Sequence, residues 1–135
     1  MTPSAVAQYG AYRQTQIQSA SPVELVVMLY RGAIRFTKAG VDGVNRKDIQ
    51  AAHTGFVRAQ EIVAELSNTL DFERGGEIAE RLSAIYSFVT RLLIQANVRK
   101  DAEPADQAGR LLESLLSAWV QVNELEKRGA DARAA

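Results

Sequence analysis

Four stretches of this chain repeat apolar residues at the spacing of an α-helix, and short polar turns separate them. The periodicity predicts helices over residues 22 to about 43, 49 to about 70, 77 to about 98 and 104 to about 128. No stretch alternates apolar and polar residues as a strand does. Because short connections force neighbouring helices to run in opposite directions, the sequence predicts an all-α fold, an antiparallel up-down-up-down four-helix bundle.

Residues with special backbone preferences mark the expected helix ends. Proline occurs only at positions 3, 22 and 104, and the last two suit the first turn of a helix. The run Ser21-Pro22-Val23-Glu24 has the pattern of a capping box, in which two side chains satisfy the free N–H groups of the first turn. Asp48 is a second expected cap, and Gly129 is the expected stop of the last helix.

Each predicted helix carries one stripe of apolar or small residues that would face the axis of the bundle. Four such stripes suffice to close a single core in a chain of 135 residues. The expected core residues are Val23, Val26, Val27, Tyr30, Ile34, Thr37 and Val41; Ala52, Phe56, Ala59, Val63, Leu66 and Leu70; Ile78, Leu82, Ile85, Val89, Leu92, Leu93 and Ala96; and Ala108, Leu111, Leu115, Ala118, Trp119 and Val122.

Several large apolar residues remain once these stripes are assigned. On the first helix Leu25, Leu29 and Phe36 fall along one side, more than about 90° from the centre of its core stripe at about 100° per residue. Leu116 and Val120 are left over on the fourth helix. Large exposed apolar patches are unusual in monomers, so a second cover is expected. The alternative is that these residues form the edges of a wide core face.

Two segments could provide this second cover. One is the chain's own N-terminus, where Tyr9, Tyr12 and Ile17 lie among small polar residues and form a strap or short helix over 1–20. The other is an amphipathic segment of a partner, laid into a groove between helices. The expected domain organisation is therefore an N-terminal segment over 1–20, a four-helix bundle over 21–128 and a flexible C-terminal tail over 129–135.

Composition excludes several classes of function. Sixteen basic and 16 acidic residues give zero formal charge, which argues against binding to nucleic acid. Without cysteine there is no disulfide, thiolate metal site or cysteine nucleophile. The N-terminus lacks the pattern of a signal peptide, and no apolar run is long enough to span a bilayer, so a cytoplasmic protein without membrane insertion is expected.

The single histidine, His53, gives no catalytic, cofactor or metal site. A metal site in a bundle needs more ligands than one histidine can provide. A histidine phosphotransfer domain is the rival interpretation, because such domains are also four-helix bundles, and they resemble the pattern His-x-x-Lys-Gly. Here Phe56 stands where the lysine would be. A signalling bundle, either a phosphotransfer or an adaptor domain, is therefore the alternative to a non-enzymatic binding protein.

Longer motifs resemble the flagellar secretion chaperone family FliS over nearly the whole chain. The segments SASPVELVVMLYRGAIRF, RAQEIVAEL and GGEIAERLSAIYSFVTRLLIQAN occur in the family's order, followed by Trp119 in the last helix. One departure is Arg31, where the family often carries an acidic residue.

The resemblance implies a cytoplasmic chaperone that is not an enzyme and needs no cofactor. Members of the family hold the C-terminal segment of flagellin, which is disordered in the free subunit, in hydrophobic grooves. They thereby prevent premature polymerisation and help to present the cargo to the export gate, and their N-terminal segment covers part of the groove when cargo is absent. The expected partner-binding residues are Tyr9, Tyr12, Ile17, Leu25, Leu29, Phe36, Leu116 and Val120. Self-association of the cargo-free protein as a homodimer stays open.

Overall fold

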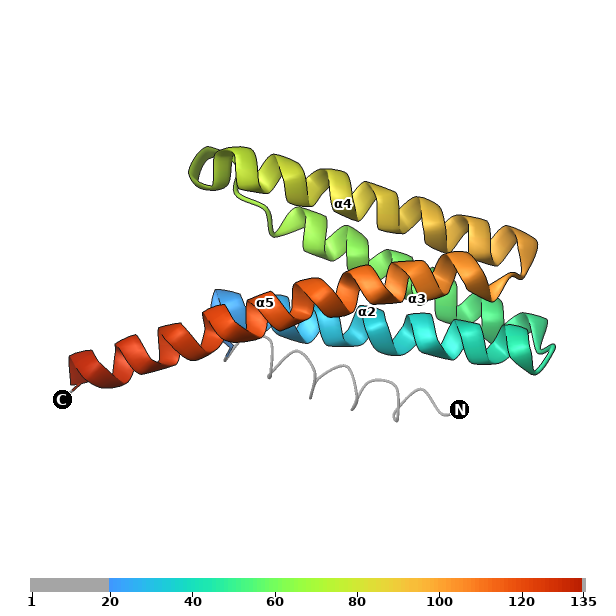
Figure 1. The fold of residues 1–135 in the computed structure, drawn as a ribbon, viewed down its shortest axis with the longest axis horizontal. Coiled ribbons are helices and arrows are strands. Elements are labelled where there is room, and N and C mark those ends of the chain that lie inside the picture. Colours follow the sequence, from blue (N-terminus) through green and yellow to red (C-terminus); the bar gives the residue numbers. More distant parts are fainter. Residues whose placement is uncertain (1–19, 135) are drawn as a thin grey trace, which may run out of the picture.

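Four long helices make up the regular structure of residues 20–134, the part of the chain that the computed structural model describes. They are α2 (Pro22–Asn45), α3 (Ile49–Asn68), α4 (Phe72–Arg99) and α5 (Ala102–Ala134). Successive helices run in opposite directions, and α2 and α4 each pack against both α3 and α5 (Figure 1). The predicted all-α, up-down-up-down bundle is therefore confirmed.

The first two helices begin at the predicted caps. The Ser21 side chain accepts a hydrogen bond from the Glu24 backbone N–H at 3.1 Å, and the Glu24 carboxylate accepts one in return from the Ser21 N–H. Asp48 accepts a hydrogen bond from the backbone N–H of Ala51 at 3.0 Å. Because these side chains replace the missing partners of the first turn, they fix where each helix starts.

The two later helices extend beyond their predicted ends. Asp71 accepts hydrogen bonds from two N–H groups of the first turn of α4, and this turn over 72–75 does not continue smoothly into the main helix from residue 77, so the predicted break at the glycine pair is present. Gly76 forms the kink, with φ at +50°, a left-handed value that glycine adopts without steric cost. Helix α5 passes through Gly129 and continues to Ala134, so the expected end near Arg128 is wrong. The division into N-terminal segment, bundle and tail stays a prediction.

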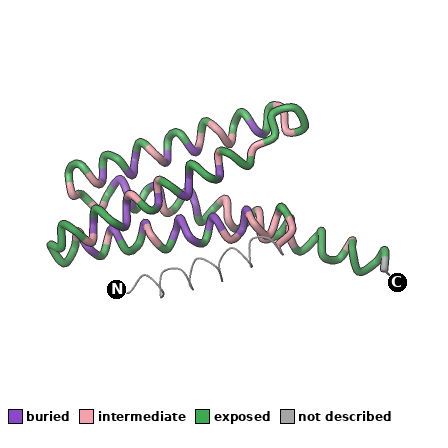
Figure 2. Tube along the Cα trace, turned by 180° about the vertical axis from the view of Figure 1, so that it is seen from behind, coloured by how far each residue is buried: buried purple, intermediate pink, exposed green. Residues whose placement is uncertain are grey.

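The predicted core stripes largely coincide with the buried core, and the exposed exceptions are Ile78, Ala118 and Val122. Ile78 is 69% exposed because it lies in the first turns of α4, next to the kink. Val122 is 39% exposed and lies on α5, whose C-terminal part projects beyond the other helices and is mostly exposed in Figure 2. Tyr86, Ala105 and Leu112 are fully or almost fully buried, although the sequence did not assign them to the core.

Helices α2 and α3 are held unusually close by three glycines. A Cβ atom added at Gly43 would lie 2.8 Å from the Cα of Ala52, and one added at Gly55 would lie 2.7 Å from the Cα of Gly40. Real Cβ atoms essentially never approach other heavy atoms within 3.0 Å. At Gly40 an added Cβ would collide with the ring of Phe56. The two backbones therefore touch without intervening side chains, which fixes which side of α2 faces α3.

A hydrogen bond between two tyrosines joins opposite corners of the core. The hydroxyls of Tyr30 on α2 and Tyr86 on α4 lie 2.6 Å apart, and both residues are buried. Their rings are tilted by 57° with centroids 6.2 Å apart. Because the two hydroxyls hydrogen-bond to each other, both polar groups are satisfied inside the core.

Replacing Tyr86 with phenylalanine is expected to lower the free energy of unfolding by about 1–2 kcal/mol, because the buried hydroxyl of Tyr30 loses its partner. Denaturant unfolding followed by circular dichroism measures this change. The double variant Tyr30→Phe/Tyr86→Phe should lose less than the sum of the two single variants, since it leaves no polar group unpaired. Strictly additive losses would contradict this account of the pair.

The same pair predicts a dependence on alkaline pH. Burial raises the pKa of Tyr30, and burial followed by the hydrogen bond to Tyr30 raises the pKa of Tyr86. Tyrosines in the unfolded chain lose their protons near pH ~10. The neutral tyrosine pair therefore contributes its full share to the free energy of unfolding below pH ~10, and this share is lost as the pH rises further. The double phenylalanine variant should lose less stability than the wild type above that pH.

Candidate partner-binding groove

The seam between α2 and α5 contains two adjoining hollows. The first has a volume of about 360 Å³ and the second about 420 Å³, and Lys38 and Glu113 line both. We call the two together the α2–α5 groove. Its principal lining residues are Arg31, Ile34, Arg35, Lys38 and Val41 from α2 and Asp106, Gly109, Arg110, Glu113 and Leu116 from α5.

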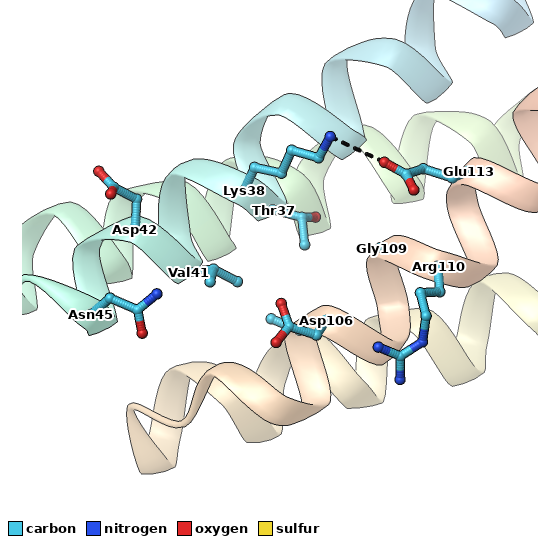
Figure 3. A pocket seen from close by; sticks show the side chains of 10 residues that line it. Thr37, Lys38, Val41, Asp42, Asn45, Asp106, Gly109, Arg110 and Glu113 are labelled. Carbon is cyan, nitrogen blue, oxygen red and sulfur yellow. Dashed lines mark ion pairs between the residues drawn. The ribbon is translucent and has the colours of Figure 1, made fainter.

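Small residues on α5 keep the first hollow open. Gly109 lies opposite Thr37 (Figure 3), and a Cβ added to it would meet no atom closer than the Thr37 methyl carbon at 4.0 Å. The Thr37 hydroxyl donates a hydrogen bond to the carbonyl oxygen of Ala33 at 2.7 Å, so it is satisfied within its own helix. Glycines therefore have opposite effects on the two sides of α2. At the contact with α3 they let the two backbones touch, whereas Gly109 of α5 leaves empty space beside α2.

A salt bridge crosses the groove between its two hollows. Nζ of Lys38 lies 3.1 Å from a carboxylate oxygen of Glu113, and both side chains are more than half exposed (Figure 3). Exposed pairs of this kind contribute about 1 kcal/mol or less to stability. The bridge can therefore open without a large loss of stability, and an incoming segment could displace it.

The second hollow combines an apolar floor with a basic edge. Ile34 is almost completely buried beneath it, and Leu116 is half-buried and packs against the core from α5. Arg31, Arg35 and Lys38 line the same hollow from successive turns of α2. This pattern, apolar at the base and charged at the edge, is typical of a surface that accepts one face of an amphipathic helix.

A third hollow lies where α5 leaves the bundle. Its volume is about 710 Å³, and it is lined by the first turn of α2, including Ser21 and Glu24, and by the last turns of α5. Val122 and Leu125 contribute exposed apolar surface there, and Leu125 is 65% exposed. Because α2 and α5 also form the α2–α5 groove, apolar surface recurs along the same pair of helices.

The predicted partner-binding residues of α2 do not line this groove. Leu29 is 4% exposed and belongs to the core, so the expectation that it lies outside the core is wrong. Leu25 and Phe36 are partly buried and pack against the core. Residues 25, 29 and 36 precede Gly43 by close to whole numbers of helical turns, so they share its side of α2, the side that α3 covers. The sequence predicts a second cover over these residues, and in the structure helix α3 lies on that side of α2.

The remaining predicted site residues have different outcomes. Leu116 lines the second hollow, and Val120 is half-buried one turn further along α5. Tyr9, Tyr12 and Ile17 lie outside the described residues. Sequence reasoning did not assign the basic edge of α2 or Gly109 to a site. A glycine inside an otherwise regular helix was the available signal for the hollow, but periodicity does not show what lies opposite it.

No other chemical site stands out in the described part of the chain. Exposed His53 forms a hydrogen bond of 3.0 Å through Nδ1 with the side-chain amide of Asn97 on α4. Within residues 20–134 no three histidine, aspartate or glutamate side chains gather closely enough to hold a metal ion. No helix in this range is long and apolar enough to cross a membrane.

Comparison with known proteins decides the family. A family model described as flagellar protein FliS matches residues 5–126. The chain belongs to the FliS family. It is 36% identical over 118 residues to the flagellar secretion chaperone FliS of Campylobacter jejuni, a match that covers 87% of this chain and 92% of that relative. The FliS chaperone of Salmonella typhimurium is 35% identical over 118 residues, covering 84% and 87% of the two chains.

A more distant relative extends the same likeness. FliS of Bacillus subtilis is 29% identical over 120 residues, which is 89% of each chain. Members of this family are chaperones of flagellar export and not enzymes. This FliS-family protein is accordingly a flagellar export chaperone, and family membership sets aside the alternative of a histidine phosphotransfer domain.

Proposed function

We propose that this FliS-family protein is a cytoplasmic chaperone for flagellin. In this proposal it binds the disordered C-terminal segment of flagellin, prevents its premature polymerisation and helps to deliver it to the export gate. The observation that carries the proposal is the α2–α5 groove, whose apolar floor and charged edge suit an amphipathic helix. Family membership supports a role in flagellar export.

The apolar surface along α2 and α5 offers anchor points for a bound peptide. Leu116, Val122 and Leu125 all present apolar surface at the hollows between these helices. Each large apolar side chain contributes roughly 1.5–3 kcal/mol when it becomes fully buried. A disordered segment gives up on the order of 2–5 kcal/mol in becoming ordered. Three such anchors are therefore comparable in size with the cost of ordering the segment.

The proposal also includes the N-terminal segment as a displaceable cover. Tyr9 and Tyr12 each combine an apolar ring with a polar hydroxyl, and Ile17 adds an apolar side chain, a composition that suits a cover that must leave. A cover that competes with flagellin lowers the apparent affinity for the client. Deleting residues 1–17 should then raise that affinity, whereas an unchanged affinity would contradict competition.

Replacing Leu116 with alanine should weaken binding of a flagellin C-terminal peptide about tenfold, because part of an apolar anchor is lost from the groove floor. Isothermal titration calorimetry measures the affinity, and a large negative heat-capacity change should accompany binding as apolar surface is buried.

Ile94→Ala provides the matched control for this experiment. Ile94 is an exposed large apolar residue on α4, which does not line the groove. The control should bind with wild-type affinity. The proposed function would be rejected if the wild-type protein failed to bind the flagellin peptide at micromolar concentrations. Equal weakening by the two substitutions would place the binding surface elsewhere.

A further inference from the structure

The basic edge of the second hollow has more positive charge than the surrounding chain neutralises. Arg31, Arg35 and Lys38 line this hollow, and Glu113 is its single carboxylate. Glu113 pairs with Lys38. Neither arginine forms an ion pair with any residue in the range 20–134. The guanidinium of Arg35 lies over the ring of Phe36, 5.4 Å from its centroid, while Arg35 also lines the hollow, so a bound carboxylate would compete with this ring contact for the arginine.

The chain's own N-terminal segment does not have the chemistry to neutralise these arginines. Residues 1–19 contain no aspartate or glutamate, and Arg13 adds a further positive charge. If this segment covers the groove, it does so through apolar contacts and repels the basic edge. A bound partner that carries carboxylates beside the groove would therefore find Arg31 and Arg35 available for pairing.

The spacing of the arginines defines the partner further. Arg31 and Arg35 are four residues apart, so they stand about one helical turn, or roughly 5–6 Å, from each other on one face. Two acidic residues four apart on a helical partner have the same spacing. Beside the arginines lies the apolar floor formed by Ile34 of α2 and Leu116 of α5. A single partner helix can satisfy both features if an acidic edge borders its apolar face.

We infer that the part of the groove between Arg31 and Leu116 binds an acidic amphipathic helix, whose apolar face is bordered by two carboxylates one turn apart. The inference rests on the proposed function, because the client segment that occupies the groove is where these carboxylates belong. Paired with the two arginines, they give the client an advantage over the acid-free N-terminal segment. They also make association faster at low ionic strength, because opposite charges attract over about 30 Å at about 0.01 M salt and over only about 10 Å at about 0.1 M.

Two synthetic peptides test the inference with the full-length protein. Both are amphipathic helices with leucines on one face, and the edge of that face carries two glutamates four residues apart in one peptide and two glutamines in the other. Fluorescence anisotropy should show that the glutamate peptide binds about tenfold more tightly than the glutamine peptide at low salt. The ratio should shrink as the salt concentration rises.

Charge reversal identifies the residues responsible. Arg31→Glu/Arg35→Glu should abolish the preference for the glutamate peptide and favour a third peptide with lysines at the same positions. The matched control is Arg58→Glu/Arg91→Glu, which makes the same charge change on α3 and α4. Arg91 also lies over an aromatic ring, that of Phe88, at 5.9 Å, so the control removes a comparable contact. Thermal unfolding establishes that both double variants are folded.

The outcomes separate this inference from the proposed function. Equal affinity for the glutamate and glutamine peptides, a preference that survives the Arg31→Glu/Arg35→Glu change, or binding of neither peptide would each overturn the inference. The flagellin C-terminal peptide, titrated separately, decides the proposed function. Binding of flagellin without any preference for glutamate rejects the inference alone. Binding of the glutamate peptide without binding of flagellin rejects the proposed function alone.

Discussion

Replacing Gly55 with alanine is expected to lower the free energy of unfolding by about 3 kcal/mol, because the new methyl group has no space between α2 and α3. It would lie 2.7 Å from the Cα of Gly40 and 2.8 Å from the carbonyl oxygen of Phe36. Both are backbone atoms, so no side chain can rotate away and the helices must separate. Denaturant unfolding measures the loss, and the melting temperature should fall by about 10 °C.

Gly109→Ala is the matched control, because it makes the same substitution inside another helix. The nearest atom to its added Cβ is 4.0 Å away, which is an ordinary contact distance. Alanine also favours the helical conformation over glycine by about 0.5–1 kcal/mol. Gly109→Ala should therefore leave stability unchanged or raise it slightly. A similar loss in both variants would show that the close approach of α2 and α3 is not the cause.

Replacing Leu29 with alanine should also lower the free energy of unfolding by about 3 kcal/mol, and it should leave the affinity of the folded protein for the flagellin peptide unchanged. Leu29 is buried in the core on the side of α2 that α3 covers, and it does not line the α2–α5 groove. Truncation leaves a cavity there and removes no surface available to a partner. Chemical denaturation gives the stability, and calorimetry gives the affinity.

Leu116→Ala should show the reverse profile, with a small loss of stability and a clear loss of affinity, because Leu116 is half-buried at the groove floor. The two leucines are therefore a direct test of which apolar residues belong to the core and which to the groove. Leu29 would be a groove residue after all if Leu29→Ala weakened peptide binding and lowered the free energy of unfolding by less than about 2 kcal/mol, the smallest loss expected for a Leu→Ala change in a core.

Helical periodicity was sufficient to predict the elements of this fold, but not the neighbours of each face. Spacing shows that residues 25, 29 and 36 share one side of the first helix. It does not show that another helix already covers that side. The structure shows it, because Gly40, Gly43 and Gly55 bring the backbones of α2 and α3 into contact beside these residues. The surplus of apolar residues on α2 is therefore mostly core.

The family motifs were more informative about function than the residue-by-residue assignment of a site. The runs SASPVELVVMLYRGAIRF and GGEIAERLSAIYSFVTRLLIQAN pointed to the FliS family, and the comparisons confirm that membership. The groove itself was not predictable, because it depends on small residues of α5 facing Thr37 and Val41 across a seam between distant segments. Leu116 is the predicted site residue that lines it.

The sequence alone determined the four helices, their antiparallel order and the capped starts of α2 and α3, because periodicity and capping depend on residues within a few positions of each other. Only the tertiary structure decided that α3 covers Leu29 and that an open groove lies between α2 and α5. These features depend on how closely distant backbones approach. Steric contact between whole helices sets that distance, and no local pattern records it.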